Sequence, residues 1–375
     1  GAIATRLADV VTGAGDATTF NSTEGVLYVE MASISNDGQY KSVSLKNNTT
    51  STYEDTINIT YSAVSNIISA VYRVGTTSEV VISKTLYNSL EFIKCAFKFK
   101  NGDFAFWVNG VEEGTDTNTT MLSSGTLNEA VFSRSDGASP FYGKVRALSV
   151  FNEDLTDLEL KCLTLLDGAT LLNGENLADV GDSLLDQNGT QPILMAKYNI
   201  ASNQSLSVGG KKMVSGDADS VVNQIQAITN NPKLILIGGG TNDFYTSSPI
   251  GNLNSTDTTE YCGAVSFVLD YAIANYPDAT ILKLGLPFGN LATANTSADG
   301  QINASGLTRS DYMNAEKQLC EDRDIVYVNQ LEELGWNASN ILDKTYDGIH
   351  PIAEGSQDRA NLFFTYIDEL FPPIN

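Results

Sequence analysis

The feature that most limits the fold of this chain is a change of hydrophobic pattern after Val150. Before it, short runs of alternating apolar and polar residues recur between clusters of Asn, Gly, Ser and Thr, which is typical of antiparallel sheets. From about residue 176 onward, continuous apolar runs of strand length alternate with segments of helical period, which indicates a doubly wound α/β domain. The 375 residues also exceed what one core usually organises. We therefore expect two domains, 1–170 and 171–375.

The first part predicts strands throughout. Alternating runs lie at residues 26–31, 57–61, 68–72 and 80–82, at intervals typical of a β-sandwich. Two further runs, 92–99 and 104–108, flank an Asn-Gly turn and predict a hairpin, and a second tight turn is expected at 109–110. A short helix should follow, because Thr156 can cap it and Glu159 completes a capping box.

The second part predicts strands and helices in alternation. Strands are expected at residues 177–180, 205–208, 234–237, 280–284 and 325–328, and helices at 218–228, 260–274, 310–321 and 355–370. Several of the strands are continuous apolar runs, as expected for parallel strands that are covered on both faces. Residues 173–176 look like a linker. In such a sheet, ligands bind beyond the carboxyl ends of the strands.

Composition narrows the classes of function. The net charge is −23, and such a surface repels phosphate backbones, so we expect no nucleic acid as a partner. No run of about 18 apolar residues exists, so we expect no membrane insertion. The four cysteines are far apart without metal-binding spacing, and we expect neither a disulfide framework nor a metal. The acidic, Asn-, Thr- and Ser-rich composition suits an extracellular setting: secreted, on a cell surface or on a virion.

Three short segments carry residues suited to catalysis. They are residues 181–184 (GDSL), 238–243 (GGGTND) and 347–351 (DGIHP). The first two follow predicted strands, and the third leads into the last predicted helix. Because strand ends and helix starts share one edge of a parallel sheet, all three segments can converge there. Each alone is an ordinary turn or cap; together, in this order, they favour a catalytic site.

A serine hydroxyl becomes a nucleophile when a base takes its proton, and imidazole suits that task near neutral pH. The chain has one histidine, so a mechanism of this kind must pair Ser183 with His350. Asp347 can hold the far ring nitrogen of His350. Asp343 is the weaker candidate because it is farther from His350 in the sequence. Oxyanion donors could be the Ser183 N–H, an N–H in a glycine turn and the Asn242 amide. We expect the two other aspartates of these segments to be structural; they are Asp182 and Asp243.

These segments resemble the sequence blocks of SGNH (GDSL-like) hydrolases, over about residues 175–372. The resemblance implies a flavodoxin-like, three-layer α/β/α fold and hydrolysis of an ester without a metal or organic cofactor. It implies the catalytic residues Ser183, Asp347 and His350. It also implies an oxyanion hole formed by Ser183, Gly210 and Asn242, and for its glycine we choose Gly210 over Gly209.

The first part resembles concanavalin A-like, laminin-G-type domains over about residues 15–168. Residues 104–111 (FAFWVNGV) look like their strand-turn segment, and residues 141–151 with the following helix look like their closing elements. This resemblance implies a jelly-roll sandwich that either binds a glycan or serves as a spacer or oligomerisation module. Tyr40, Tyr53 or Tyr142 could stack on sugars. Calcium is compatible with such domains, although the sequence assigns no ligands to it.

The preferred hypothesis is a carbohydrate O-acetyl esterase that deacetylates a polysaccharide through an acyl-serine intermediate. The lectin-like module would target the glycan or support assembly, and the expected partners are an acylated polysaccharide or other glycan and further copies of this chain. One alternative is a glycan-binding or structural component of a phage tail fibre or surface adhesin; a first residue that is Gly rather than Met suits a piece of a longer fibre.

The other alternative is a lipase or thioesterase of the same fold, which needs an apolar cleft for an acyl chain. Around the motifs the residues are mostly small and polar, which favours a small acyl group. The polar residues are Thr241, Thr246, Ser247 and Ser248, and the exceptions are Phe244, Tyr245 and Phe288.

Overall fold

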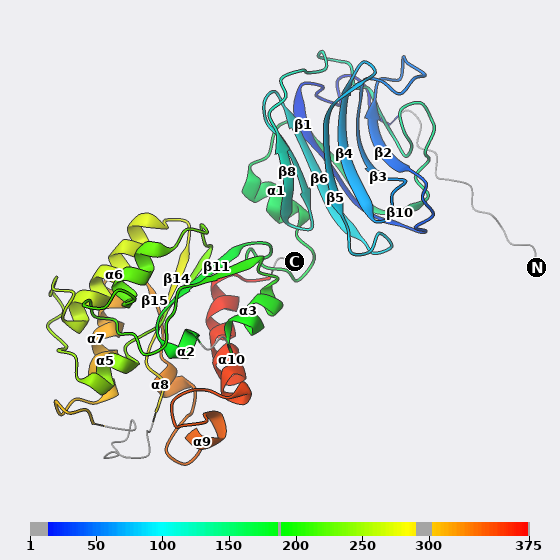
Figure 1. Ribbon diagram of the computed structural model, residues 1–375. Helices are drawn as coiled ribbons and strands as arrows, with labels where there is room; N and C mark the ends of the chain where they lie inside the picture. The colour runs from blue at the N-terminus through cyan, green and yellow to red at the C-terminus, as the bar shows by residue number, and fades with distance from the viewer. Residues whose placement is uncertain (1–13, 187–188, 290–301, 374–375) are drawn as a thin grey trace, which may run out of the picture. The chain divides into compact units, whose positions relative to one another are not determined.

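The computed structural model describes residues 14–186, 189–289 and 302–373 (Figure 1). The chain divides into two compact units, one running to Leu171 and the other spanning Leu172–Pro373. In the described residues, the first unit contains two antiparallel five-stranded sheets and the second contains one parallel five-stranded sheet. None of the described helices combines the length and the apolar character that a membrane span requires.

The two sheets of the first unit pack about one shared core. One sheet has the order β10 (Gly143–Phe151), β1 (Glu24–Ser33), β6 (Ile93–Lys100), β7 (Phe104–Val108) and β8 (Val111–Asp116). The other has the order β5 (Thr77–Thr85), β4 (Ile67–Val74), β3 (Thr56–Tyr61), β2 (Lys41–Lys46) and β9 (Glu129–Val131). Alternate side chains of both sheets, such as Leu27, Val43 and Phe97, are fully buried between them. The β-rich first part is therefore as the alternating pattern predicts.

The hairpin and the helix expected in this unit are both present. Strands β6 and β7 pair in antiparallel fashion about the Asn-Gly turn. Helix α1 (Asp157–Thr164) begins at a capping box, in which the Glu159 N–H donates to Thr156 and the Thr156 N–H donates to the Glu159 carboxylate. Leu160 of this helix packs on Val26 and Trp107, so α1 covers the outer face of the β1–β6–β7 region.

The second unit is a parallel sheet in the order β12 (Ser202–Ser205), β11 (Asn176–Val180), β13 (Leu234–Ile237), β14 (Thr280–Leu284) and β15 (Val326–Val328). Numbered within this sheet, the strand order is 2-1-3-4-5, the flavodoxin-like order that the resemblance implies. Figure 1 shows the sheet between two helical layers, with α6 (Tyr261–Asn275) and α7 (Arg309–Glu321) on one side and α3 (Gln191–Tyr198) and α10 (Ala353–Leu370) on the other. The shorter helices are α2 (Ser183–Asp186), α4 (Val221–Gln224), α5 (Thr241–Thr246), α8 (Gln330–Glu333) and α9 (Ile341–Lys344).

The strand predicted at residues 205–208 is wrong, because the strand lies three residues earlier, in β12. Its sequence is polar, and what orders it is the buried carboxylate of Asp179 on the neighbouring β11. Asn203 and Ser205 donate hydrogen bonds to Asp179 at 2.7 and 2.8 Å, and Ser207 donates another at 2.6 Å. A strand held by polar contacts at the edge of a sheet gives no hydrophobic signal.

The helix predicted at residues 218–228 is also wrong in extent. Helix α4 has four residues and continues as a 3-10 turn, Ile225–Ala227. Helix α4 begins later than predicted because Asp217 forms a separate turn. Its carboxylate accepts the Asp219 N–H at 3.1 Å and pairs with Lys211 at 2.9 Å. The linker predicted at residues 173–176 ends one residue early, since Asn176 already belongs to β11.

Candidate active site

The three candidate segments meet at the carboxyl edge of the parallel sheet. Ser183 follows β11, and Asn242 follows β13, the neighbouring strand. The strand order reverses between these two strands, which is where doubly wound sheets open a crevice for a ligand. His350 lies in the loop that leads into α10. The structure therefore brings together residues that are separated by up to 167 positions in the chain.

Ser183, His350 and Asp347 form a hydrogen-bonded chain. The Oγ of Ser183 lies 2.8 Å from Nε2 of His350, and Nδ1 of the same imidazole lies 2.6 Å from Oδ2 of Asp347. Ser183 is 8% exposed, so its hydroxyl is shielded from bulk water while the imidazole and the carboxylate remain partly accessible. This is the arrangement in which an imidazole can accept a serine proton while a carboxylate orients the ring.

The loop that carries Asp347 and His350 is held in shape by its own hydrogen bonds. Oδ1 of Asp347 accepts the N–H groups of Ile349 and His350 at 3.0 and 2.8 Å, and the Tyr346 N–H donates to the His350 carbonyl at 3.0 Å. Burial alone would raise the pKa of Asp347, but the donors from His350 and Ile349 outweigh it and lower that pKa. The carboxylate is therefore kept ionised opposite the ring nitrogen.

Four contacts fix the backbone around Ser183. Oδ1 of Asp182 accepts the Leu184 N–H at 3.0 Å, so Asp182 bonds the loop backbone, as expected for a structural role. Gln224 accepts the Gly181 N–H at 2.6 Å and donates to the Gly181 carbonyl at 3.0 Å. From α10, the guanidinium of Arg359 donates to the Leu184 carbonyl at 2.5 Å. The segment on both sides of Ser183 is thus held by its own Asp182 and by side chains from two other parts of the unit, α4 and α10.

Asp182 and Arg359 are both ionisable and both buried. Burial raises the pKa of Asp182, while the Leu184 N–H and the charge of Arg359 oppose that rise. Burial lowers the pKa of Arg359 to about 10, and the charge of Asp182 opposes the fall. Arg359 also donates from Nε to Gln330 at 2.8 Å. Each of the two groups therefore opposes the pKa shift that burial imposes on the other.

The candidate oxyanion donors differ in how the structure places them. Nδ2 of Asn242 donates to the Lys211 carbonyl at 2.9 Å, which fixes the amide and leaves its second N–H for another acceptor. Gly209 lies beside Ser183, since a methyl group added there would be 3.7 Å from the serine Cβ, but its N–H already donates to Asp186 at 2.9 Å. The next residue, Gly210, has φ +75°, and its N–H has no partner among the described residues.

The turn after β13 requires glycine. Gly240 has φ +115°, and a side chain there would also collide with the hydroxyl of Tyr261. Just after Asn242, the carboxylate of Asp243 accepts the N–H groups of Met213 and Val214 at 2.6 and 3.3 Å, as expected for a structural aspartate. The segment that presents Asn242 is therefore tied to the segment after Gly210.

Sequence reasoning missed several residues that shape the site: Gln224, Arg359, Asp186 and Tyr346. Arg359 was the one with a usable signal, because it occupies the buried stripe of α10 together with Gly355 and Phe363. A charged residue in an apolar stripe indicates a buried polar partner. Tyr346 is 60% exposed, and its ring stacks on the imidazole of His350 at 5.5 Å, so it forms part of the wall of the site.

Asp343 is exposed on α9, and the two ring nitrogens of His350 are paired with Ser183 and Asp347 instead. All four cysteines are free, and three of them are buried. In the described ranges, no group of three or more His, Cys, Asp and Glu side chains is arranged to hold a metal ion.

Comparison with known proteins gives one family. Residues 180–357, a little under half of the chain, match the model of the GDSL-like Lipase/Acylhydrolase family. No curated protein matches the chain. Similar solved structures include a protein from Lactobacillus plantarum (22% identity, 52% of this chain and 98% of that one, TM-score 0.48).

A GDSL-like lipase from Bacteroides thetaiotaomicron is also similar (16% identity, 52% of this chain and 89% of that one, TM-score 0.40). A leech intramolecular trans-sialidase shares 21% identity over 38% of this chain and 23% of its own length, with a TM-score of 0.33. The family match falls on the segments that hold the serine, the glycine turn and the histidine. The second unit carries a GDSL-like (SGNH) serine ester hydrolase domain.

Proposed function

We propose that Ser183 is the nucleophile of this hydrolase, His350 its general base and Asp347 the residue that orients the base. The observation that carries the proposal is the hydrogen-bonded chain Ser183–His350–Asp347, in which the two distances are 2.8 and 2.6 Å. Nε2 of His350 takes the serine proton as Oγ attacks the ester carbonyl carbon. Asp347 accepts the Nδ1–H, which leaves Nε2 as the basic nitrogen and stabilises the imidazolium that forms.

The negative charge on the carbonyl oxygen of the tetrahedral intermediate needs donors. We assign them to the Ser183 N–H, the Gly210 N–H and the Asn242 amide. The fixed amide of Asn242 supports this assignment, because Lys211 uses one of its two hydrogens and the other remains. The intermediate collapses when His350 protonates the departing alcohol, leaving an acyl group on Ser183. His350 then takes a proton from water as the water oxygen attacks the acyl-serine. The acid is released, and His350 returns the proton to the Oγ of Ser183.

The substrate class that we favour is an O-acetyl ester of a polysaccharide. Two of the three aromatic residues near the motifs, Phe244 and Phe288, are buried in packed cores and do not offer an apolar cleft for a long acyl chain. Tyr346 is instead exposed beside His350 and presents an aromatic surface at the site. A polar alcohol with a small acyl group suits these surroundings.

A lipase or thioesterase activity is the second candidate, and one observation favours it. A cavity of about 410 Å³ lies next to the segments that carry the serine and the histidine, and five of its eight lining residues are apolar, although the surface that faces it is slightly more polar than apolar. It is formed by Leu184, Gly189, Ile193, Pro351, Ile352, Ala353, Ser356 and Gln357. Neither Ser183 nor His350 lines this cavity, so it borders the site without including the reacting groups.

For the first unit, we propose a lectin-like jelly roll that holds the hydrolase close to its glycan, in an extracellular setting. Support comes from the paired antiparallel sheets and from the acidic composition of the chain. Fractionation of source cells would test the setting: the protein should be found in the medium, on the cell surface or on virions.

The decisive experiment compares the unaltered chain with Ser183→Ala on p-nitrophenyl esters of short and long acyl chains and on acetylated xylan, with acetate release as the readout. The proposal expects acetate release from both acetyl substrates, little activity on long chains, and loss of nearly all activity in the variant. A fluorophosphonate should add once to the chain, and peptide mapping should place it on Ser183.

Ser202→Ala is a control, because Ser202 is exposed at the amino end of β12, at the edge of the sheet opposite to the candidate segments. Preference for long acyl chains would select the lipase alternative. Full turnover by Ser183→Ala, or a label on another serine, would overturn the assignment of the nucleophile.

A further inference from the structure

A cavity of about 320 Å³ with a mixed polar and apolar lining lies on the first unit, over the sheet β5-β4-β3-β2-β9. Its size falls in the range of small-ligand pockets. The lining combines hydroxyl groups, two tyrosines, two valines and one guanidinium. It consists of Tyr40, Ser42, Tyr53, Thr60, Ser62, Ser69, Val71, Val81 and Arg134.

The floor of this cavity is the outer face of the sheet, and that face is unusual. The inward residues of the same strands, such as Val43, Ile59 and Ala70, are buried in the apolar core. Several of their outward neighbours are polar, and of these Ser42, Thr60 and Ser69 are only 2–8% exposed. Val71 and Val81 add apolar groups to the same face. An outer sheet face normally meets water, so a polar face enclosed to this degree is a recess that can surround a polar molecule.

The floor presents paired hydroxyl groups. The hydroxyls of Ser42 and Thr60 lie 2.8 Å apart, and those of Ser69 and Ser83 are also 2.8 Å apart. Each hydroxyl oxygen has two lone pairs and one hydrogen, so such pairs keep capacity to accept further hydrogen bonds. A ligand rich in hydroxyl groups would match this floor.

The wall is aromatic. Tyr40 is 51% exposed, and Tyr53 is partly buried, with the guanidinium groups of Arg73 and Arg134 over its ring at 4.2 and 4.6 Å. Asn58 donates to the Tyr53 hydroxyl at 3.0 Å. Tyrosine rings offer an apolar surface with a polar tip, which suits a molecule that has both C–H faces and hydroxyl groups.

A buried acceptor beneath the wall has no partner among the described residues. Asn58 is 1% exposed, and its Oδ1 makes no hydrogen bond there. Buried polar atoms are nearly always paired, so this acceptor is an exception on the outer face of the sheet; Asn58 itself does not line the cavity.

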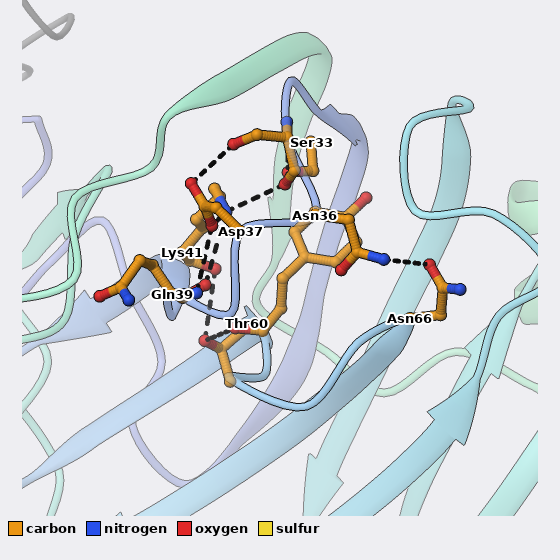
Figure 2. Close-up of polar contacts among 9 residues, drawn as sticks. Ser33, Asn36, Asp37, Gln39, Lys41, Thr60 and Asn66 are labelled. Carbon is orange, nitrogen blue, oxygen red and sulfur yellow. Dashed lines mark hydrogen bonds and ion pairs between the residues drawn. The ribbon is translucent and has the colours of Figure 1, made fainter.

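The loop that carries Tyr40 is held by polar contacts of its neighbour Lys41, and Figure 2 shows the contact between Lys41 and Asp37. Nζ of Lys41, which is nearly fully buried, donates to Asp37 at 2.6 Å and to the Ser35 carbonyl at 3.1 Å. The hydrogen bond from Lys41 is the main reason that the pKa of Asp37 is lowered, and Ser35 adds to the effect. Because the loop is fixed in advance, Tyr40 would lose little freedom when a ligand binds.

The charge of the cavity selects among hydroxyl-rich ligands. Its one ionic group, Arg134, is already paired with Asp136 through two hydrogen bonds of 2.9 and 2.6 Å. The whole chain carries a net charge of −23, which repels anions. An uncharged ligand is favoured over a uronate or a sulfated sugar.

We propose that this cavity binds a neutral saccharide unit, with Tyr40 as its aromatic contact and Ser42, Thr60 and Ser69 as its polar floor. The proposal rests on the proposed function only in naming the source: the unit belongs to the polysaccharide whose esters the second unit hydrolyses. Binding itself requires no catalysis.

The test measures binding to the full chain carrying Ser183→Ala, so that hydrolysis plays no part. The probes are tetrasaccharides of four neutral backbones (β-1,4-glucan, β-1,4-xylan, β-1,4-mannan and β-1,4-galactan) and tetragalacturonate, followed by saturation-transfer NMR and calorimetry. At least one neutral probe should bind, and Tyr40→Ala should weaken it about tenfold or more. Tyr142→Ala is the matched control, because Tyr142 is also 51% exposed but does not line the cavity.

A second variant, Val81→Trp, guards against loss of folding in Tyr40→Ala. Val81 lines the cavity and is 55% exposed, so the larger ring should fill the mouth and abolish binding without disturbing the core. Failure of every probe to bind, binding of the uronate alone, or equal binding by all variants would overturn the proposal. Absence of esterase activity in the unaltered chain, with binding intact in the Ser183→Ala chain, would instead count against the proposed function.

Discussion

Asp347 holds His350 at two points: Oδ2 lies 2.6 Å from the ring Nδ1, and Oδ1 accepts the backbone N–H of the same residue at 2.8 Å. One carboxylate therefore sets both the position of the main chain and the orientation of the imidazole. With Nδ1–H directed at Asp347, the lone pair of Nε2 faces the Ser183 hydroxyl. The tautomer needed for a base is fixed before a substrate arrives.

The first prediction concerns this carboxylate. Asp347→Asn replaces an acceptor with an amide that can turn its N–H groups toward Nδ1 and favour the wrong tautomer. We expect kcat for p-nitrophenyl acetate to fall by roughly 10³–10⁴-fold, with a smaller change in KM. The control is Asp343→Asn, since that carboxylate is exposed on α9 and contributes nothing to the imidazole contacts. Equal losses in the two variants would contradict the role of Asp347.

The second prediction concerns Arg359. Arg359→Met leaves the Leu184 carbonyl and Gln330 without their donor and removes the positive charge that offsets buried Asp182. We expect a loss of about 2–4 kcal/mol in the free energy of unfolding, because buried acceptors would remain unpaired. We also expect kcat to fall more than KM rises, since the segment around Ser183 loses its anchor.

Thermal melts and initial rates check this prediction, with Lys317→Met, a change at an exposed position of α7, as the control. Arg359→Lys should recover part of the stability, because the charge returns without the planar fork that reaches two acceptors. A fully active and stable Arg359→Met protein would show that the anchor is unnecessary.

Much of the fold of the second unit could be predicted, because parallel strands that are buried on both faces consist of continuous runs of apolar residues. The bounds of β13 and β14 agree with the prediction to the residue. Strand β12 could not be found in this way, since it lies at the edge of the sheet and is ordered by hydrogen bonds to Asp179. Such a partner is visible only once β11 and β12 are side by side.

The candidate site shows the same division. Ser183 and His350 stand in short segments whose order along the chain indicates their meeting, because strand ends converge at one edge. Gln224 and Arg359 stand in no such pattern. Gln224 bonds Gly181 from 43 residues away in the sequence, and Arg359 bonds Leu184 from 175 residues away. Their roles depend on distances in space that no local spacing encodes. The choice between Gly209 and Gly210 likewise depends on which N–H Asp186 occupies.

The third prediction concerns an ion pair in the core of the second unit. Lys283 on β14 and Glu316 on α7 are completely buried and hydrogen-bonded to each other, and Glu316 also accepts from Tyr261 at 2.5 Å. Burial raises the pKa of Glu316, although Lys283 opposes that rise. Glu316→Gln should cost about 3–5 kcal/mol of unfolding free energy, because fully buried Lys283 would lose its carboxylate partner.

The measurement needs a signal from this unit alone, and the chain provides one. Its two tryptophans are Trp107 in the first unit and Trp336 in the second, both buried. In a Trp107→Phe background, fluorescence in urea reports only on Trp336. Lys283→Met combined with Glu316→Leu should recover much of the loss; if the effects of the two changes simply add, the pair is not coupled.

The last prediction concerns pH and Asp243. Burial raises the pKa of this carboxyl group to about 6, against an ordinary value of 3.8. Since the folded-state pKa is the higher one, the stabilising contribution is fully present below about pH 4 and is lost as the pH rises through about 6. Because one proton is involved, the free energy of unfolding should fall by roughly 3 kcal/mol between about pH 4 and about pH 6.

Other carboxylates also titrate in this window, so the useful quantity is the difference between the unaltered chain and Asp243→Asn. In the Trp107→Phe background, urea unfolding at a series of pH values from about 4 to about 7 should show the destabilisation by Asp243→Asn to be largest at the acidic end and to shrink steadily. Asp278→Asn serves as the control because Asp278 is exposed in the same unit, and its difference should stay flat. A difference for Asp243→Asn that grows with pH would mean that the buried carboxylate is favoured in its ionised form, held by the N–H groups of Met213 and Val214 more strongly than burial opposes it.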